Sequence, residues 1–101
     1  MVALRKLLAE AGLTIGQVDL MELHELFPGQ ALCWAREARV DVDRINTCGG
    51  STCLGNPLGC SGVRIVVTLA HAMQQCGARY GIAAVESLDA TGVALLLQRT
   101  E

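Results

Sequence analysis

Residues 46–64, NTCGGSTCLGNPLGCSGVR, form a glycine-rich run that leads into the most apolar segment of the chain. A glycine-rich turn before a helix brings backbone N–H groups and the positive end of the helix dipole to one point, which suits a phosphate or a developing oxyanion. The run contains neither GxGxxG nor GxxxxGK[ST], so the common nucleotide-binding loops are disfavoured. Asn56, in the middle of the run, adds a compact amide that can donate hydrogen bonds at that point.

Two further polar residues follow apolar runs and are candidates for chemistry. His24 comes directly after residues 18–23, VDLMEL, where it serves either an oxyanion or catalytic role or a structural one at a strand end. Glu86 lies near the end of a second apolar run, and it is either an acid/base group or a carboxylate that faces solvent. Asn56 is either a functional residue or a structural one, because asparagine before Pro57 also suits a simple turn.

The five cysteines do not form a metal-binding or disulfide pattern. Their number is odd and no pair is spaced as CxxC, so we expect free thiols that pack as small hydrophobic side chains. The spacing of the three in the glycine-rich run also fails to match the ligand spacing of a zinc site. We therefore predict no metal; the cysteines are Cys33, Cys48, Cys53, Cys60 and Cys76.

The composition indicates one globular domain with an aliphatic core. Apolar residues make up 51% of the 101 residues and charged residues 18%, whereas aromatic residues make up only 3%. Small and branched side chains favour helices layered on a sheet, so the predicted class is α/β. The net charge of −2 and the lack of a basic cluster disfavour nucleic acid, and no apolar run is long enough to span a membrane. We expect a cytoplasmic protein without a nucleic-acid or membrane partner.

Periodicity predicts three helices and four short strands around these residues. In chain order the predicted elements are a helix at 2–11, a strand at 18–23, a helix at 28–39, a strand at 45–47, a helix at 58–76, and strands at 80–87 and 93–98.

The long helix at 58–76 is unusually apolar. Its polar side chains Arg64, Thr68, His71 and Gln75 form one narrow stripe, and such a helix is normally buried between layers. Because a chain of 101 residues with short strands covers one side of it, we expect a second domain or chain against the other side. The alternative is a single sheet whose exposed helix mediates dimerisation.

Three stretches of the chain resemble the C-terminal half of the thiolases, enzymes that join or split acyl-CoA at a carbon–carbon bond. HELF at 24–27 is similar to the thiolase NEAF or HEAF motif, in which the acid, here Glu25, braces loops. INTCGGSTCLGNPLGCSGVRI at 45–65 resembles the segment N-x-x-G-G-x-x-x-x-G-H-P-x-G-x-[ST]-G-x-R. YGIAAVESLDATGVALLL at 80–97 is similar to the closing strand pair, so the resemblance covers nearly the whole chain.

The chain also departs from the thiolase pattern at its catalytic positions. Asn56 replaces the histidine of G-H-P, and Glu86 replaces the second catalytic cysteine. Residues 88–90, LDA, replace glycines of the closing motif, and His24 stands where many members have asparagine. The pair of His24 and Asn56 resembles the ketoacyl synthases that initiate fatty acid synthesis, which use cysteine, histidine and asparagine. That resemblance implies that both side chains donate hydrogen bonds to a thioester or enolate oxygen.

The resemblance implies a fold and a missing part. The expected fold is the C-terminal half of the thiolase fold, a mixed sheet with helices on its faces, with its first and central strand missing. Residues 1–101 would then be an N-terminally truncated thiolase C-terminal-like domain. The nucleophilic cysteine of the superfamily belongs to the N-terminal half, so we predict that this chain alone is inactive.

The implied function is the C-terminal part of an acyl-CoA C-acyltransferase, acting in lipid metabolism by Claisen condensation or thiolysis. The resemblance assigns catalytic roles to His24, Asn56 and Glu86, and contacts with the coenzyme A thioester to Gly55, Gly59 and Ser61. The thioester of CoA or of an acyl carrier is the substrate, and no separate cofactor is expected. The expected partner is an N-terminal thiolase half or subunit within a homo- or hetero-oligomer. The alternatives are an inactive structural or regulatory subunit and a degraded gene remnant.

Overall fold

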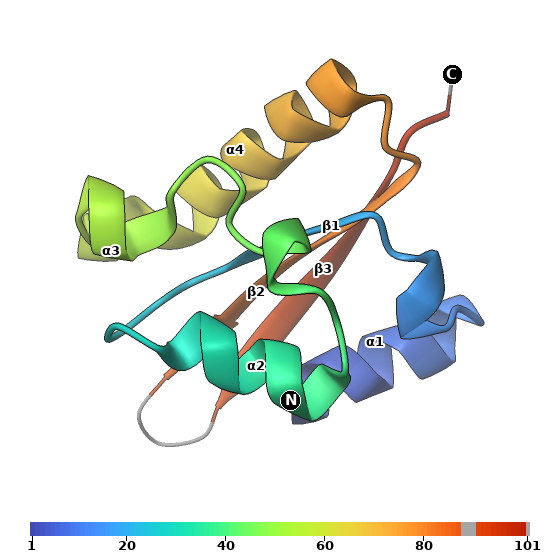
Figure 1. The fold of residues 1–101 in the computed structure, drawn as a ribbon, viewed down its shortest axis with the longest axis horizontal. Coiled ribbons are helices and arrows are strands. Elements are labelled where there is room, and N and C mark those ends of the chain that lie inside the picture. Colours follow the sequence, from blue (N-terminus) through green and yellow to red (C-terminus); the bar gives the residue numbers. More distant parts are fainter. Residues whose placement is uncertain (88–90, 101) are drawn as a thin grey trace.

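The computed structural model describes residues 1–87 and 91–100. Its centre is a three-stranded sheet in the order β1 (Leu20–Leu23), β2 (Tyr80–Glu86) and β3 (Gly92–Gln98), as Figure 1 shows. β1 and β2 run parallel, whereas the strand pair predicted at the end of the chain, β2 and β3, is antiparallel. The predicted mixed sheet of an α/β fold is therefore confirmed.

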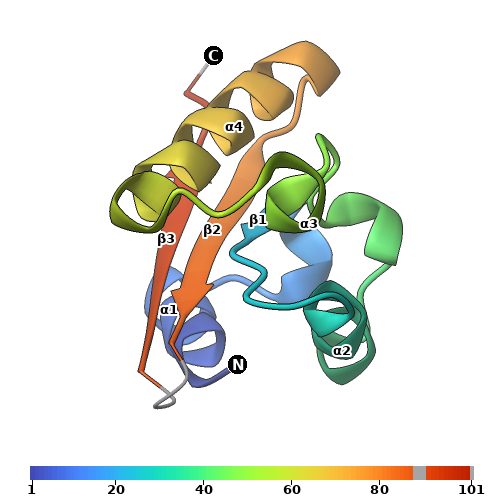
Figure 2. The ribbon, with the colours of Figure 1, turned by 90° about the vertical axis from the view of Figure 1, so that its left-hand side faces the viewer.

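Helices cover the two faces of the sheet, as two views at right angles show (Figures 1 and 2). α1 (Val2–Ala11) and α2 (Gln30–Ala38) pack on one face, and α4 (Ser61–Cys76) packs on the other. The short helix α3 (Gly50–Leu54) and three 3-10 turns, at Ile15–Gln17, Val42–Arg44 and Leu58–Cys60, connect these elements. Each face thus has its own aliphatic core, with Met21, Leu23 and Ile82 on the α1 side and Ile65, Leu69 and Ala83 on the α4 side.

Three predicted boundaries shift for local reasons. Pro28 and Gly29 form a turn, so α2 begins at Gln30 rather than at residue 28. The helix predicted at 58–76 begins as a 3-10 turn and becomes α-helical at Ser61. The strand predicted at 45–47 is reduced to one bridge between Ile45 and Met21, because Asn46 adopts φ 51° and turns the chain away.

The predicted position of the missing strand is wrong. β1 pairs directly with β2, from Leu20 opposite Gly81 to Leu23 opposite Ala84, so no strand is missing between them. Within residues 1–87 and 91–100, β3 has one strand neighbour and its other edge is unpaired. A further strand can therefore join only at an edge of this sheet.

The cysteines are free thiols as predicted, but the prediction that they pack as small hydrophobic side chains is wrong. All five are free and all five are exposed. The buried apolar positions hold larger aliphatic side chains instead, among them Leu4, Ile65 and Leu69. Three of the cysteines belong to the glycine-rich run, which offers few side chains to pack against.

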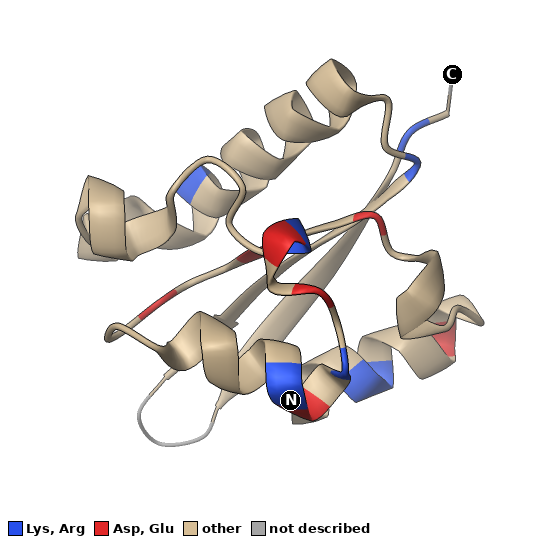
Figure 3. Cartoon of the chain, viewed as in Figure 1, with Lys and Arg blue, Asp and Glu red and all other residues tan. Residues whose placement is uncertain are grey.

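The outer face of α4 is apolar and uncovered by the described part of the chain. Val63 is 68% exposed and Val67 is 50% exposed, and Leu58 in the preceding turn is 82% exposed. Arg64 is the only charged residue of this helix, as Figure 3 shows. None of the helices in the described ranges has the length and hydropathy needed to cross a bilayer.

Candidate active site

His24 is held at the end of β1 by the backbone of the neighbouring strand. Its N–H donates to the carbonyl oxygen of Ala84 in β2 at 2.9 Å, which continues the parallel pairing by one residue. Alternation along the strand places its side chain on the α4 side, the side of Leu20. The imidazole is buried there, so its direction is fixed by the strand rather than by a mobile loop.

Asn56 meets His24 although 32 residues separate them in sequence. The Nε2 atom of His24 lies 2.9 Å from Oδ1 of Asn56, and the hydroxyl of Ser61 donates to the same Oδ1 at 2.7 Å. An oxygen acceptor requires the proton on Nε2, so the imidazole is the donor of this bond. The two bonds fix the carboxamide plane and leave its Nδ2 amide as a donor without a hydrogen-bond partner in the described residues.

The residues predicted to contact a thioester fall into two groups. Gly55 and Gly59 face open space, because an added Cβ would meet no heavy atom within 4 Å at either position. Ser61 is 3% exposed and is the first residue of α4, where its hydroxyl is used by Asn56. Gly55 and Gly59 thus border open space and Ser61 holds the side chain of Asn56, while contact of these three residues with a thioester stays a prediction.

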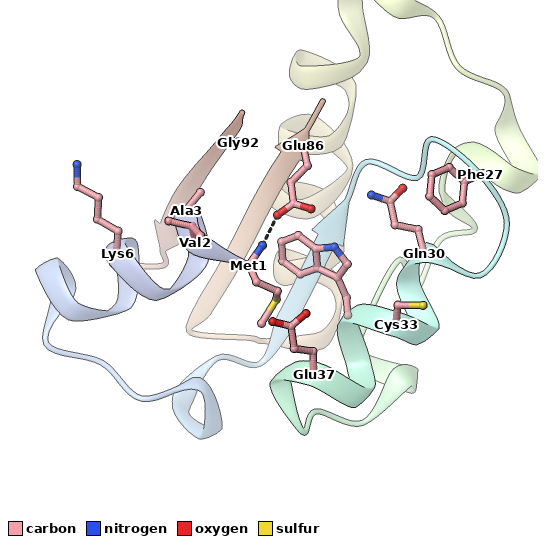
Figure 4. A pocket seen from close by; sticks show the side chains of 11 residues that line it. Met1, Val2, Ala3, Lys6, Phe27, Gln30, Cys33, Glu37, Glu86 and Gly92 are labelled. Carbon is pink, nitrogen blue, oxygen red and sulfur yellow. Dashed lines mark hydrogen bonds and ion pairs between the residues drawn. The ribbon is translucent and has the colours of Figure 1, made fainter. Parts of the chain in front are cut away.

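Glu86 does not join this cluster. Alternation along β2 turns Ala83 and Val85 toward α4 and Glu86 toward the opposite face of the sheet. There its carboxylate forms an ion pair with the ammonium group of Met1 and lines a cavity of about 530 Å³ together with Phe27 and Gln30 (Figure 4). The acid/base role of Glu86 stays a prediction.

A second set of contacts seats the glycine-rich run on β1. Asn46 accepts a hydrogen bond from the N–H of Leu23 at 2.7 Å and donates to the carbonyl of Leu23 at 3.0 Å. Glu25 accepts from the N–H of Thr52 in α3 at 3.2 Å, so it braces this loop as expected. Gly50 lies between the two side chains with φ +68°. Sequence reasoning missed Asn46 and Gly50, although asparagine and glycine are the residues that favour positive φ.

Sequence reasoning also missed a buried acid beneath the site. Glu22, in the middle of β1, is 1% exposed, and burial raises its pKa to about 7. The charge of Arg64 acts in the opposite direction on this pKa, and Glu25 adds to the increase. The available signal was an acid inside a strand that is otherwise apolar, which is costly unless a partner is near.

We expect Glu22→Gln to remove a pH dependence of stability. Between pH 4.5 and about 7, the unfolded chain has released the Glu22 proton while the folded chain retains it, so the stability of the natural protein falls as pH rises. Integrated over that interval, the loss is about 3 kcal/mol. The variant should therefore match the natural protein near pH 4.5 and be about 3 kcal/mol more stable at pH 8. Urea unfolding at several pH values measures the free energy of unfolding of both proteins. An equal change of this free energy with pH in the natural protein and in Glu22→Gln would contradict the prediction.

The comparison with family models gives one match that spans nearly the whole chain. Residues 1–99 match the model described as thiolase, C-terminal domain.

Curated relatives and solved structures agree with this match. An acetyl-CoA acetyltransferase of Chromobacterium violaceum is 44% identical over 97 residues, which are 96% of this chain and 25% of that protein. The mouse protein named acetyl-CoA acetyltransferase, cytosolic, is 38% identical over 96% of this chain and 24% of its own length. The crystal structure of the Bacillus anthracis acetyl-CoA acetyltransferase has a TM-score of 0.90 at 35% identity, over 95% of this chain and 24% of that one. The chain thus spans about a quarter of the length of the relatives it matches.

Proposed function

Because the chain belongs to the thiolase family, as its C-terminal domain, we propose that it supplies the oxyanion-binding wall of an acyl-CoA C-acyltransferase. The reaction is the condensation or thiolysis of acyl thioesters. The observation that carries this proposal is the hydrogen-bonded cluster of His24, Asn56 and Ser61, which leaves one amide donor free beside open glycine surface.

The free amide suits the charge that develops in this chemistry. Attack on a thioester, and formation of its enolate, both place negative charge on the carbonyl oxygen, and a fixed donor stabilises that charge. Asn56 is such a donor, because His24 and Ser61 occupy its Oδ1 and prevent the amide from rotating. In this proposal His24 orients Asn56, and its Nε2–H lies at the edge of the same site.

The nucleophile comes from a partner region in this proposal. No hydrogen bond in the described residues joins any of the five cysteines to His24 or Asn56. We place the attacking sulfur in an N-terminal thiolase half, in the same polypeptide or in another subunit. The exposed valines of α4, Val63 and Val67, are the apolar surface on which that half would pack.

The proposed substrate is a coenzyme A thioester, bound over Gly55 and Gly59. Similarity to acetyl-CoA acetyltransferases supports CoA as the carrier, and the cytosolic mouse relative supports a cytosolic location. Glu86 is proposed to handle protons only if the assembled enzyme turns its carboxylate away from Met1, with which it is now paired.

The test is an assay of this chain assembled with an N-terminal thiolase half. We expect thiol-dependent cleavage of a 3-ketoacyl-CoA, or condensation of two acyl-CoA molecules, by the assembly and none by the chain alone. The control replaces Glu10, an exposed residue of α1 on the other side of the sheet from the cluster, by alanine and should leave turnover unchanged. A folded assembly without turnover would contradict the proposal and favour the inactive structural or regulatory subunit.

A further inference from the structure

β3 is an edge strand whose outer side is open. It has one strand neighbour in the described residues, and Figure 2 shows it at the margin of the sheet. Its register with β2 is unbroken from Gly92 to Gln98, and its sequence, GVALLLQ, contains no proline and no charged residue. Bulges, prolines and charges are the features that keep an edge strand from pairing with another chain. β3 therefore lacks the usual protection against such pairing.

The opposite edge of the sheet is closed by the chain itself. Ile45 forms a bridge to Met21 in β1, next to which the side chain of Asn46 hydrogen-bonds both backbone groups of Leu23. A strand from another chain would have to displace these contacts in order to pair with β1. Within residues 1–87 and 91–100, the chain thus protects one edge of its sheet and leaves the edge at β3 open.

The hydrogen bonds at the two ends of β3 determine which of its backbone groups face the open edge. The carbonyl of Thr91 accepts from the N–H of Ser87 at 2.8 Å, and the N–H of Arg99 donates to the carbonyl of Arg79 at 2.9 Å. In an antiparallel pair, residues that bond across alternate with residues that do not. The odd-numbered residues of β3 therefore bond to β2. The even-numbered ones direct their N–H and C=O groups outward: Gly92, Ala94, Leu96 and Gln98.

Two apolar side chains of the same strand are exposed beside this open row of backbone groups. Val93 is 69% exposed and Leu95 is 46% exposed. Both lie on the α4 side of the sheet, because Ala94 and Leu96 alternate with them and pack on the α1 side. A strand paired with β3 would therefore cover apolar surface as well as satisfy backbone groups.

We propose that β3 pairs antiparallel with β3 of a second copy of this chain, about a two-fold axis at Leu95. Leu95 is the central residue of the strand. The register then sets Ala94 opposite Leu96 of the second copy and Gly92 opposite Gln98, so the outward N–H and C=O groups bond to one another. The two three-stranded sheets become one continuous sheet. This association does not depend on the proposed reaction.

A second copy fits this edge because the strand is complementary to itself in that register. Val93 meets Leu97 of the second copy and Leu95 meets its own counterpart, so the exposed apolar side chains cover one another. Arg99 lies opposite Thr91, which keeps the two arginines apart. Two-fold pairing uses both open edges, so the assembly closes as a dimer and does not extend into a fibre.

Cysteine cross-linking tests the register. Leu95→Cys sets two thiols directly opposite each other, where the Cα atoms of a non-hydrogen-bonded pair lie about 4.5 Å apart, within the range of a disulfide. In oxidised glutathione we expect a disulfide between the two introduced cysteines, identified by mass spectrometry of the non-reduced peptides. Val93→Cys is the matched control, since Val93 lies opposite Leu97 and not opposite itself. Equal cross-linking of the two variants would overturn the register.

Charge substitution tests the association itself. Leu95→Lys and Leu95→Glu each set like charges opposite one another, so each variant alone should sediment as a monomer, whereas the natural chain sediments as a dimer. A mixture of the two variants sets opposite charges together and should restore the dimer, which misfolded variants cannot do. A natural chain that stays monomeric, or a dimer that survives Leu95→Lys, would overturn the proposal.

The assembly with an N-terminal thiolase half distinguishes the other occupant of this edge, a strand of that half. If β3 pairs between copies, Leu95→Lys should halve the mass of the assembly and leave the N-terminal half bound. Release of that half by Leu95→Lys would show that it holds the strand that pairs with β3. That result contradicts pairing between copies, and so does an unchanged mass of the assembly.

Discussion

Replacement of Asn56 by alanine is expected to lower kcat of the assembled enzyme by a factor of about 10²–10³, the usual effect of removing one oxyanion-hole donor. The Nδ2 amide of Asn56 is the donor that the structure leaves unpaired, and its orientation is fixed by His24 at 2.9 Å and Ser61 at 2.7 Å. The effect should fall on kcat rather than KM, because the bond strengthens only when charge develops on the oxygen. Steady-state kinetics of condensation or thiolysis measure it.

Ser61→Ala provides the graded comparison for this prediction. It removes one of the two bonds that orient the amide but leaves the donor, so we expect a loss of about tenfold, the value of one hydrogen bond. A second comparison is Asn56→His, which restores the residue of the thiolase motif. If Asn56→Ala retains the activity of the natural protein, Asn56 is not the oxyanion donor. If Asn56→His then raises activity, the natural chain acts as a structural subunit.

The sequence predicted the elements whose signal is local. α1, α4 and the β2–β3 pair follow from apolar periodicity, and α1 ends at Gly12, whose φ of 65° suits a glycine. The reduction of the strand predicted at 45–47 to one bridge was not predictable in this way, because the side chain of Asn46 takes over the backbone groups of Leu23 that a strand would have used. The direct pairing of β1 with β2 depends on contacts about 60 residues apart, which no local pattern reports.

The candidate site was predictable in part. The family resemblance of two motifs placed His24 and Asn56 in one site. The structure brings these residues within hydrogen-bond distance. The separation of Glu86 from them follows from the alternation of side chains along β2, which depends on register and not on the order of motifs. Glu22 was missed although an acid inside an apolar strand is a signal, because Arg64, whose charge acts on it, lies on another element far along the chain.

Replacement of Gly50 by alanine is expected to destabilise the protein by about 2–4 kcal/mol, by overpacking together with backbone strain. A Cβ at this position would lie 2.7 Å from Oε2 of Glu25 and 2.8 Å from Nδ2 of Asn46, so at least one side chain must move. Both side chains are engaged, Glu25 with the Thr52 N–H and Asn46 with the Leu23 backbone. Urea unfolding at a fixed pH measures the change in the free energy of unfolding.

Gly12→Ala separates the two contributions to this effect. Gly12 has φ +65°, nearly the value of +68° at Gly50, but an added Cβ there would meet no atom within 4 Å. Its replacement therefore reports the backbone strain alone, about 1 kcal/mol. Gly50→Ala should exceed it by 1 kcal/mol or more and should also lower kcat, because Glu25 and Asn46 seat the loop that carries Asn56. Equal losses from the two variants would show that Glu25 and Asn46 yield freely to the new methyl group. The run would then not be held against β1 as the structure indicates.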